Sequence, residues 1–223
     1  MSSTLPVKVI AGVEVVDTPL VRAAQDFARQ HLDDLAYNHV MRSWIFGVII
    51  YQHFRDKGEF PAIDLEAHAV SAILHDLGWD KTGELVSVDK RFEVDGAIAA
   101  RNFIEEQQKL QLVWDAIALH STPAIAAYKE PVVRLCSFGT SVDFQGPDSD
   151  RTRTVTWEEF HALNNVFPRH DLASGVRKVM CGLCRTKPAT TYDTFVMGWG
   201  RKYVEGYQEK EKLMYEIVER ALL

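Results

Sequence analysis

The chain has 223 residues, of which 47% are hydrophobic and 25% are charged. This composition is ordinary for a soluble globular protein and excludes a disordered or collagen-like chain, and the length suits one large domain with a sizeable core. The net charge of −6 argues against broad nucleic-acid binding, which needs a basic surface, and it says nothing about a small substrate.

The cysteines and the N-terminus indicate the cellular compartment in which the protein is expected. Three cysteines, an odd number, do not form a disulfide framework. Cys181 and Cys184 form a CxxC, but no second pair completes a zinc knuckle, so we expect ordinary helical thiols. No secretory signal is recognisable, and the longest apolar run, residues 44–51, is far shorter than the roughly 20 residues of a membrane span. We therefore expect a cytoplasmic protein that does not bind membranes, and the sequence leaves homo-oligomer formation open.

The residue pattern predicts an all-α fold in a single domain. Residues 1–17 hold short β-branched pieces and are expected to form an arm on the surface. Capping residues, prolines and glycines then mark the ends of segments with apolar residues at helical spacing. The expected helices are 19–30, 35–57, one opened by Pro61 and Asp64 that ends near Gly78, 92–108, 113–120 and 131–143.

The C-terminal third is also expected to be helical. Thr156 and Glu159 have capping-box spacing before an apolar run. Further helices are expected from about Leu172 and from about Tyr192, and the last covers 203–222. Polar residues predict loops over 79–90 and 145–155. Because no repeat or linker divides the chain, we expect the helices of 156–223 to pack on those before them.

The adjacent pair His75 and Asp76 is the first candidate for chemistry. It follows the apolar residues 72–74 at the end of an expected helix. A buried aspartate is costly unless it is paired or bound to a cation. Histidine nitrogen and carboxylate oxygen suit Zn²⁺ or Fe²⁺, although this dipeptide alone is weak evidence for a metal site.

Two residues on other expected helices strengthen the interpretation. His39 lies 36 residues before His75, and Asp143 lies 67 residues after Asp76. This order of H, HD and D on separate helices resembles the HD-domain superfamily of metal-dependent enzymes over about residues 30–145. The alternative is that His39 is a core histidine and Asp143 caps a helix end.

A closer resemblance spans most of the chain. Five segments are similar to those of the cyanamide hydratase-type HD proteins: NHVMRSWIFG (38–47), AILHDLGWD (72–80), RFEVDGAIAARNFI (91–104), WDAIALHS (114–121) and LCRTKPATTYDTF (183–195). The resemblance implies a helical HD domain and hydro-lyase activity, in which water adds to a cyano group and cyanamide gives urea.

The same resemblance implies a cofactor. One divalent metal ion would be held by four side chains: His39, His75, Asp76 and Asp143. Zn²⁺ is the leading candidate, because cyanamide hydratase is described as a zinc enzyme. Fe, Mn and Ni stay open, because a set of two histidines and two aspartates tolerates each of them.

Two positions depart from other HD enzymes. HD phosphodiesterases often carry a lysine directly after the HDxG sequence, where it meets phosphate, and this chain has Trp79 there. Two-metal members place a histidine where this chain has Phe92. We therefore expect one metal ion, and a substrate pocket in which Trp79 and Phe92 favour a small neutral molecule.

His120 and Arg42 are candidate catalytic residues. In two-metal relatives the histidine that matches His120 binds the second ion, so without that ion it is free to act as a proton relay. The alternative is a surface histidine favoured by the dipole at a helix end.

Arg42 lies three residues after His39 on the same helical face, and it could orient Asp76 or a substrate, or form a structural ion pair. Asp80, in the loop after the HD pair, is interpreted either as a residue that supports the metal ligands or, preferably, as a solvated loop acid.

The remaining titratable residues near these motifs are interpreted as structural. Glu93 and Asp95 are expected to support only the first turns of their helix, and Lys90 with Arg91 to form a solvated charge run. The other histidines are expected to be structural or surface residues: His31, His53, His68, His161 and His170.

The expected function is that of a metal-dependent hydratase of a small nitrile-like substrate, with cyanamide the leading candidate. The main alternative is a metal-dependent phosphohydrolase acting on a nucleotide or other small phosphomonoester, which the absence of a lysine at position 79 disfavours. A degenerate HD fold that only binds a ligand conflicts with the intact ligand set. An iron oxygenase also stays open, but such relatives usually hold two irons, and Phe92 weakens that interpretation.

Overall fold

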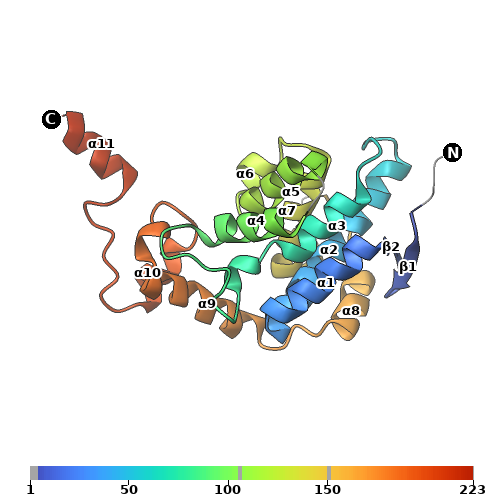
Figure 1. Ribbon diagram of the computed structural model, residues 1–223, viewed down its shortest axis with the longest axis horizontal. Coiled ribbons are helices and arrows are strands. Elements are labelled where there is room, and N and C mark those ends of the chain that lie inside the picture. Colours follow the sequence, from blue (N-terminus) through green and yellow to red (C-terminus); the bar gives the residue numbers. More distant parts are fainter. Residues whose placement is uncertain (1–4, 105–106, 150–151, 223) are drawn as a thin grey trace. The chain divides into compact units, whose positions relative to one another are not determined.

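The computed structural model describes residues 5–104, 107–149 and 152–222, which are mostly helical, and this confirms the all-α fold class (Figure 1). The chain divides into two compact units. Unit 1 combines Met1–Val86 with Phe92–His170, and unit 2 combines Ser87–Arg91 with Asp171–Leu223. No described helix has both the length and the apolar character that a membrane crossing requires.

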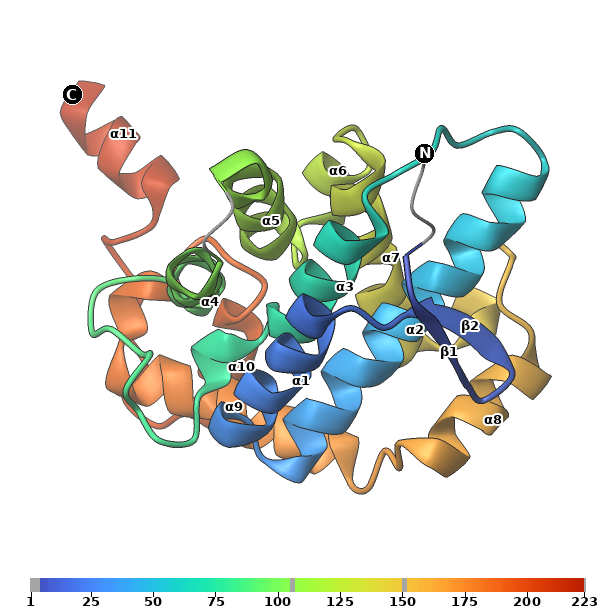
Figure 2. The same cartoon turned by 45° about the vertical axis from the view of Figure 1, so that its right-hand side comes forward.

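Unit 1 begins with an antiparallel hairpin of β1 (Val7–Ile10) and β2 (Val13–Val16), which lies beside helix α2 (Figure 2). Ala11 and Gly12 connect the strands with φ angles of 49° and 83°, as a two-residue hairpin turn of type I′ requires. The valines of β2 are buried. The predicted surface arm is therefore a hairpin whose second strand belongs to the core.

Most helices of unit 1 begin at or within one residue of their predicted starts, but one begins at Gln107 rather than at 113, and the short helix Pro123–Ala126 was not predicted. The helices of this unit are α1 (Pro19–His31), α2 (Asp34–Asp56), α3 (Leu65–Leu74), α4 (Phe92–Phe103), α5 (Gln107–Leu119), α6 (Pro123–Ala126), α7 (Pro131–Gln145) and α8 (Trp157–Val166). Thr18 and Asp64 cap α1 and α3 with their side chains, and Thr156 with Glu159 forms the predicted capping box. These signals succeed because each depends only on neighbouring residues.

Several helix boundaries differ from the prediction, and one of the differences is that α3 ends at Leu74 rather than near Gly78. The sequence predicted a helix over 92–108, but α4 ends at Phe103 and Gln107 already belongs to α5. Residues 105–106 between them lie outside the described part of the chain. Neither glycine nor proline occurs in this stretch, so the pattern held no stop signal.

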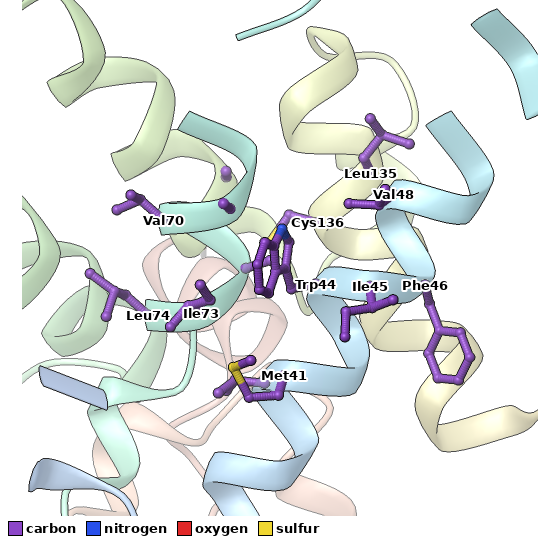
Figure 3. Close-up of a cluster of buried hydrophobic side chains, with 14 of the residues drawn as sticks. Met41, Trp44, Ile45, Phe46, Val48, Val70, Ile73, Leu74, Leu135 and Cys136 are labelled. Carbon is purple, nitrogen blue, oxygen red and sulfur yellow. The ribbon is translucent and has the colours of Figure 1, made fainter. Parts of the chain in front are cut away.

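Helices α2, α3 and α7 contribute to the core of unit 1, whose buried cluster includes Trp44 of α2 and Cys136 of α7 (Figure 3). Helix α2 approaches α7 closely at Gly139, where a Cβ atom would lie only 2.1 Å from the carbonyl oxygen of Ser43. A side chain there would push the two helices apart. This close approach places Asp143, one turn further along α7, near the first half of α2.

His68 of α3 is completely buried, with its ring against Gly47 of α2, where a Cβ atom would lie 2.6 Å from the imidazole. Neither ring nitrogen has a hydrogen-bond partner among the described residues. Burial lowers the pKa of His68 to about 4, so the side chain is neutral in the folded protein at neutral pH. The sequence interpretation of His68 as structural agrees with this position.

The buried His68 makes stability depend on pH. An unfolded histidine has a pKa of roughly 6.5, so between that value and the folded pKa of about 4 only the unfolded chain binds the proton, and stability falls as pH falls. We expect about 2 kcal/mol of unfolding free energy to be lost through His68 between pH 7.5 and pH 5. Urea unfolding at the two pH values measures this loss of unfolding free energy. The loss should be smaller by that amount in His68→Leu, whereas in His161→Leu, at an exposed position, it should equal the loss in the wild type. Equal pH dependence in the wild type and His68→Leu would contradict this expectation.

Unit 2 contains α9 (Leu172–Thr186), α10 (Met197–Tyr203) and α11 (Met214–Leu222). The predicted helix over 203–222 is wrong in its first half. Gly206 takes a φ of 73°, and Tyr207 folds back onto Gly200, where a Cβ atom would lie 2.6 Å from the tyrosine ring. The chain therefore turns between α10 and α11.

The start of α9 at Leu172 is confirmed, whereas the helix predicted from Tyr192 begins only at Met197. Cys181 and Cys184 lie on α9 as buried free thiols. This agrees with the prediction of helical thiols.

Candidate metal centre

The His75–Asp76 pair lies where α3 ends. His75 is the C-cap of α3, and Asp76 precedes the 3₁₀ turn Leu77–Trp79. The Nδ1 atom of His75 lies 2.7 Å from the carbonyl oxygen of Ala72, so Nδ1 is the donor and Nε2 carries the lone pair. Gly78 lets α4 begin directly over this turn, because a Cβ atom would lie 2.0 Å from the carbonyl oxygen of Phe92.

His39 on α2 faces this pair and is held on three sides. Its Nδ1 atom lies 2.6 Å from Oδ2 of Asp143, so its Nε2 atom also carries the lone pair. Its ring lies nearly parallel to that of Trp79, with 6.1 Å between the centroids, and its ring centroid is 4.4 Å from that of the half-exposed Phe144. These contacts fix the direction in which Nε2 points.

Three acceptor atoms meet at this point. The Nε2 atoms of His39 and His75 are 3.3 Å apart, and each lies 3.4 Å from Oδ2 of Asp76. Lone pairs that face each other this closely repel unless a positive charge lies between them. Ligands held at about 2.0–2.2 Å from a tetrahedral ion are about 3.4 Å apart, so the spacing matches the edge of such a site. The buried group of His39, His75 and Asp76 can therefore hold a metal ion.

Burial sets the charge states of the three side chains. It lowers the pKa of His39 and takes that of His75 well below its usual value, which favours the neutral imidazoles that bind metals. Burial, followed by the negative charge of Glu93, raises the pKa of Asp76 well above its usual value. Neither carboxylate oxygen of Asp76 has a hydrogen-bond partner among the described residues. A bound cation would offset the cost of burying this carboxylate.

Asp143, predicted as a fourth ligand, lies on the other side of the His39 ring. It accepts hydrogen bonds from Nε and Nη2 of Arg42 at 2.6 and 2.8 Å. Burial alone would raise the pKa of Asp143. The hydrogen bonds from His39 and Arg42 outweigh this effect and lower the pKa to about 2. Both its oxygens are therefore occupied away from the three-residue group. A carboxylate on the second nitrogen of a metal-binding histidine typically fixes the ring.

This geometry makes Asp143→Asn an informative variant. We expect it to keep the metal but to bind it about 10- to 100-fold more weakly, as is typical when the partner of a ligating histidine is lost. Competition with a chromophoric chelator would measure the affinity, and circular dichroism would check folding. If the variant loses metal as completely as Asp76→Asn, Asp143 belongs to the coordination sphere, as the sequence predicted.

Arg42 is completely buried and fully engaged. Besides Asp143, it bonds through Nη1 to the carbonyl oxygens of Phe167 and Pro168 at 2.8 and 3.2 Å. Of the roles left open by the sequence, the structure shows the ion pair, and the partner is Asp143 rather than Asp76. Arg169 lies 4.0 Å from the same carboxylate.

His120 follows α5 and reaches the group from the side of Asp76. Its Nδ1 atom lies 2.7 Å from the carbonyl oxygen of Ile117, and its Nε2 atom lies 3.6 Å from Oδ1 of Asp76. The residue is buried, so the alternative of a surface histidine is wrong. Its Nε2 atom therefore lies beside the three-residue group.

The two predicted pocket residues lie next to each other. The ring centroid of Phe92 is 5.9 Å from that of Trp79 and 5.7 Å from that of His120. Asp80, which follows Trp79, is buried and accepts hydrogen bonds from the backbone of Thr82 and Leu85. It anchors the loop after the HD turn and is not a solvated acid.

Sequence reasoning missed two neighbours of the group. Glu93 is buried, accepts a hydrogen bond from the hydroxyl of Ser121 at 2.6 Å, and has a charge that influences Asp76, so its role exceeds support of a first helical turn. Phe144 packs on His39, and its position directly after Asp143 was the only signal in the sequence.

The fold and the site together define an all-α protein with a buried His₂Asp group that can hold a metal ion. No protein-family model matches the chain, and no curated protein matches it.

Proposed function

We propose that this protein is a metal-dependent hydratase that adds water to a small nitrile-like molecule, with cyanamide, which would give urea, as the leading substrate. The observation that supports it best is the triangle of His39, His75 and Asp76, whose three acceptor atoms lie 3.3–3.4 Å apart. Three protein ligands leave a position open for water or substrate, as in catalytic zinc sites. Together with the resemblance of the sequence to cyanamide hydratase-type HD proteins, this favours one Zn²⁺ ion per chain.

A bound divalent ion would polarise a cyano nitrogen and lower the pKa of a bound water. In the proposed hydration the water oxygen bonds to the nitrile carbon, and both water hydrogens end on the nitrogen. His120 suits their transfer, because its Nδ1 atom is committed to Ile117 and its Nε2 atom faces the group. Asp143 and Arg42 hold the ring of His39, and Trp79 and Phe92 limit water around the substrate.

The phosphohydrolase alternative has less support. A transferred phosphoryl group needs cationic partners for its oxygens. Every nitrogen of the Arg42 guanidinium already bonds to Asp143, Phe167 or Pro168. Trp79, which stands where a lysine would meet phosphate, is neutral. These features favour an uncharged substrate.

Metal analysis and two assays test the proposal. Purified protein is expected to hold one equivalent of metal, and addition of cyanamide is expected to give urea, measured by a coupled urease assay. A panel of nucleotides and other phosphomonoesters is expected to release negligible phosphate. Robust phosphate release without urea would replace the hydratase by the phosphohydrolase, and two tightly bound ions would reopen the two-metal alternatives.

A further inference from the structure

Trp79 has a hydrogen-bond donor that nothing in the described structure uses. Its indole nitrogen Nε1 is buried and lacks an acceptor among the described residues, although part of the side chain reaches the surface. Tryptophan offers one donor and no acceptor, and a buried donor without a partner loses the hydrogen bond it had with water. A donor left in this state beside a candidate active site needs an explanation.

The indole ring of Trp79 lies beside the metal group. The residue ends the 3₁₀ turn that follows Asp76, and its ring is nearly parallel to that of His39, with an interplanar angle of 16°. Its ring centroid is 5.9 Å from that of Phe92. The indole therefore forms a wall of the same site.

Asp76 has acceptor atoms that the Trp79 indole does not bond. Both carboxylate oxygens of Asp76 are buried and have no hydrogen-bond partner among the described residues, although Asp76 is only three positions away from Trp79. The described residues satisfy neither the indole donor nor the Asp76 oxygens, so each group is available to a third molecule. A cation suits the oxygens of Asp76, whereas only an acceptor atom suits the indole.

We propose that the indole N–H of Trp79 donates a hydrogen bond to the substrate and so selects small uncharged molecules that carry a nitrogen or oxygen acceptor. This inference rests on the proposed function, because it assumes that the substrate binds at the metal group. A site with a buried donor rejects an apolar molecule of the same shape, since the donor then stays unpaired. The preferred class is thus nitriles and their amide products over hydrocarbons.

The indole proton can be observed directly. The chain has 5 tryptophans, so ¹⁵N-tryptophan labelling of the zinc-loaded protein gives few indole signals, and Trp79→Phe identifies the one of interest. We expect acetonitrile to move the Trp79 signal downfield in a saturable way. Propyne has the same linear shape without the acceptor nitrogen and should not move it. Trp44 supplies the matched control signal, because its indole nitrogen is also buried and unpartnered but lies in the core.

Kinetics provides the second measurement. Trp79→Phe keeps an aromatic ring and removes the donor, so kcat/KM for cyanamide is expected to fall by about three- to tenfold, the usual effect of one lost hydrogen bond. Trp44→Phe should stay within about twofold of the wild type. Should Trp79→Phe fail to fold, the titration of the wild type still decides, with the signal assigned from its contacts to His39 and Phe92.

The outcomes separate this inference from the proposed function. If no urea forms but acetonitrile moves the Trp79 signal, the hydratase proposal fails and the donor role stands. If urea forms and Trp79→Phe keeps its full kcat/KM, the hydratase stands and the donor role is refuted. A signal that does not move with acetonitrile, moves equally with propyne, or moves only with inorganic phosphate also overturns the inference.

Discussion

Replacing Asp76 with asparagine is expected to remove the bound metal and to lower the rate of cyanamide hydration by about 10³-fold or more. Asparagine preserves the shape of the side chain and removes the charge, so the buried group loses its only anionic ligand. The Nε2 atoms of His39 and His75 would remain, and two neutral ligands bind a divalent ion weakly. Loss of the ion removes several kcal/mol of transition-state stabilisation, and each 1.36 kcal/mol is a factor of about ten in rate. Elemental analysis of purified protein measures the metal, and the urea assay measures the rate.

Asp115→Asn is the matched control for this variant. Asp115 forms a partly exposed ion pair with Lys129, at 2.9 Å, so its replacement makes the same chemical change away from the metal group. It should leave metal content and rate near those of the wild type. A full equivalent of metal in Asp76→Asn would contradict the assignment of the group. Because bound metal can stabilise the fold, unfolding curves of both variants are compared with and without added zinc.

Local signals in the sequence predicted most helix starts, and tertiary contacts explain the failures. Thr18 and Asp64 were recognised because a capping side chain bonds to the backbone a few residues away. The turn after α10 was missed because it depends on Tyr207 packing on Gly200, which no periodicity reveals. The burial of β2 was missed for a similar reason, since alternation in four residues does not say which face meets a core.

The candidate site was predicted to the extent that residue type and order fix it. His39, His75 and Asp76 come together as expected. The direction of Asp143 depends on the two hydrogen bonds that it accepts from Arg42, and the sequence alone left three roles open for that arginine. Such choices follow from the close packing of α2 on α7, not from spacing along one helix.

Replacing His120 with alanine is expected to lower the hydration rate by about 10²–10⁴-fold, the usual contribution of a general acid–base group. The Nε2 atom of His120 lies 3.6 Å from Oδ1 of Asp76, whereas the three acceptor atoms of the metal group are those of His39, His75 and Oδ2 of Asp76. The variant should therefore keep its metal while losing rate, in contrast to Asp76→Asn. Elemental analysis and the urea assay on the same preparation separate the two effects.

If His120 relays protons, two further results are expected for His120→Ala besides the lower rate. Because the side chain of His120 is buried, its removal leaves a cavity, and added imidazole should restore part of the rate by supplying a nitrogen base at the same position. The pH dependence of kcat/KM should also lose one of its limbs, since that limb reports an essential acid or base of the free enzyme. His161→Ala, at an exposed position of α8, is the matched control and should change neither rate nor pH profile. If His120→Ala loses its metal, His120 acts as a ligand, and if it keeps both metal and full rate, the proton must move by another route.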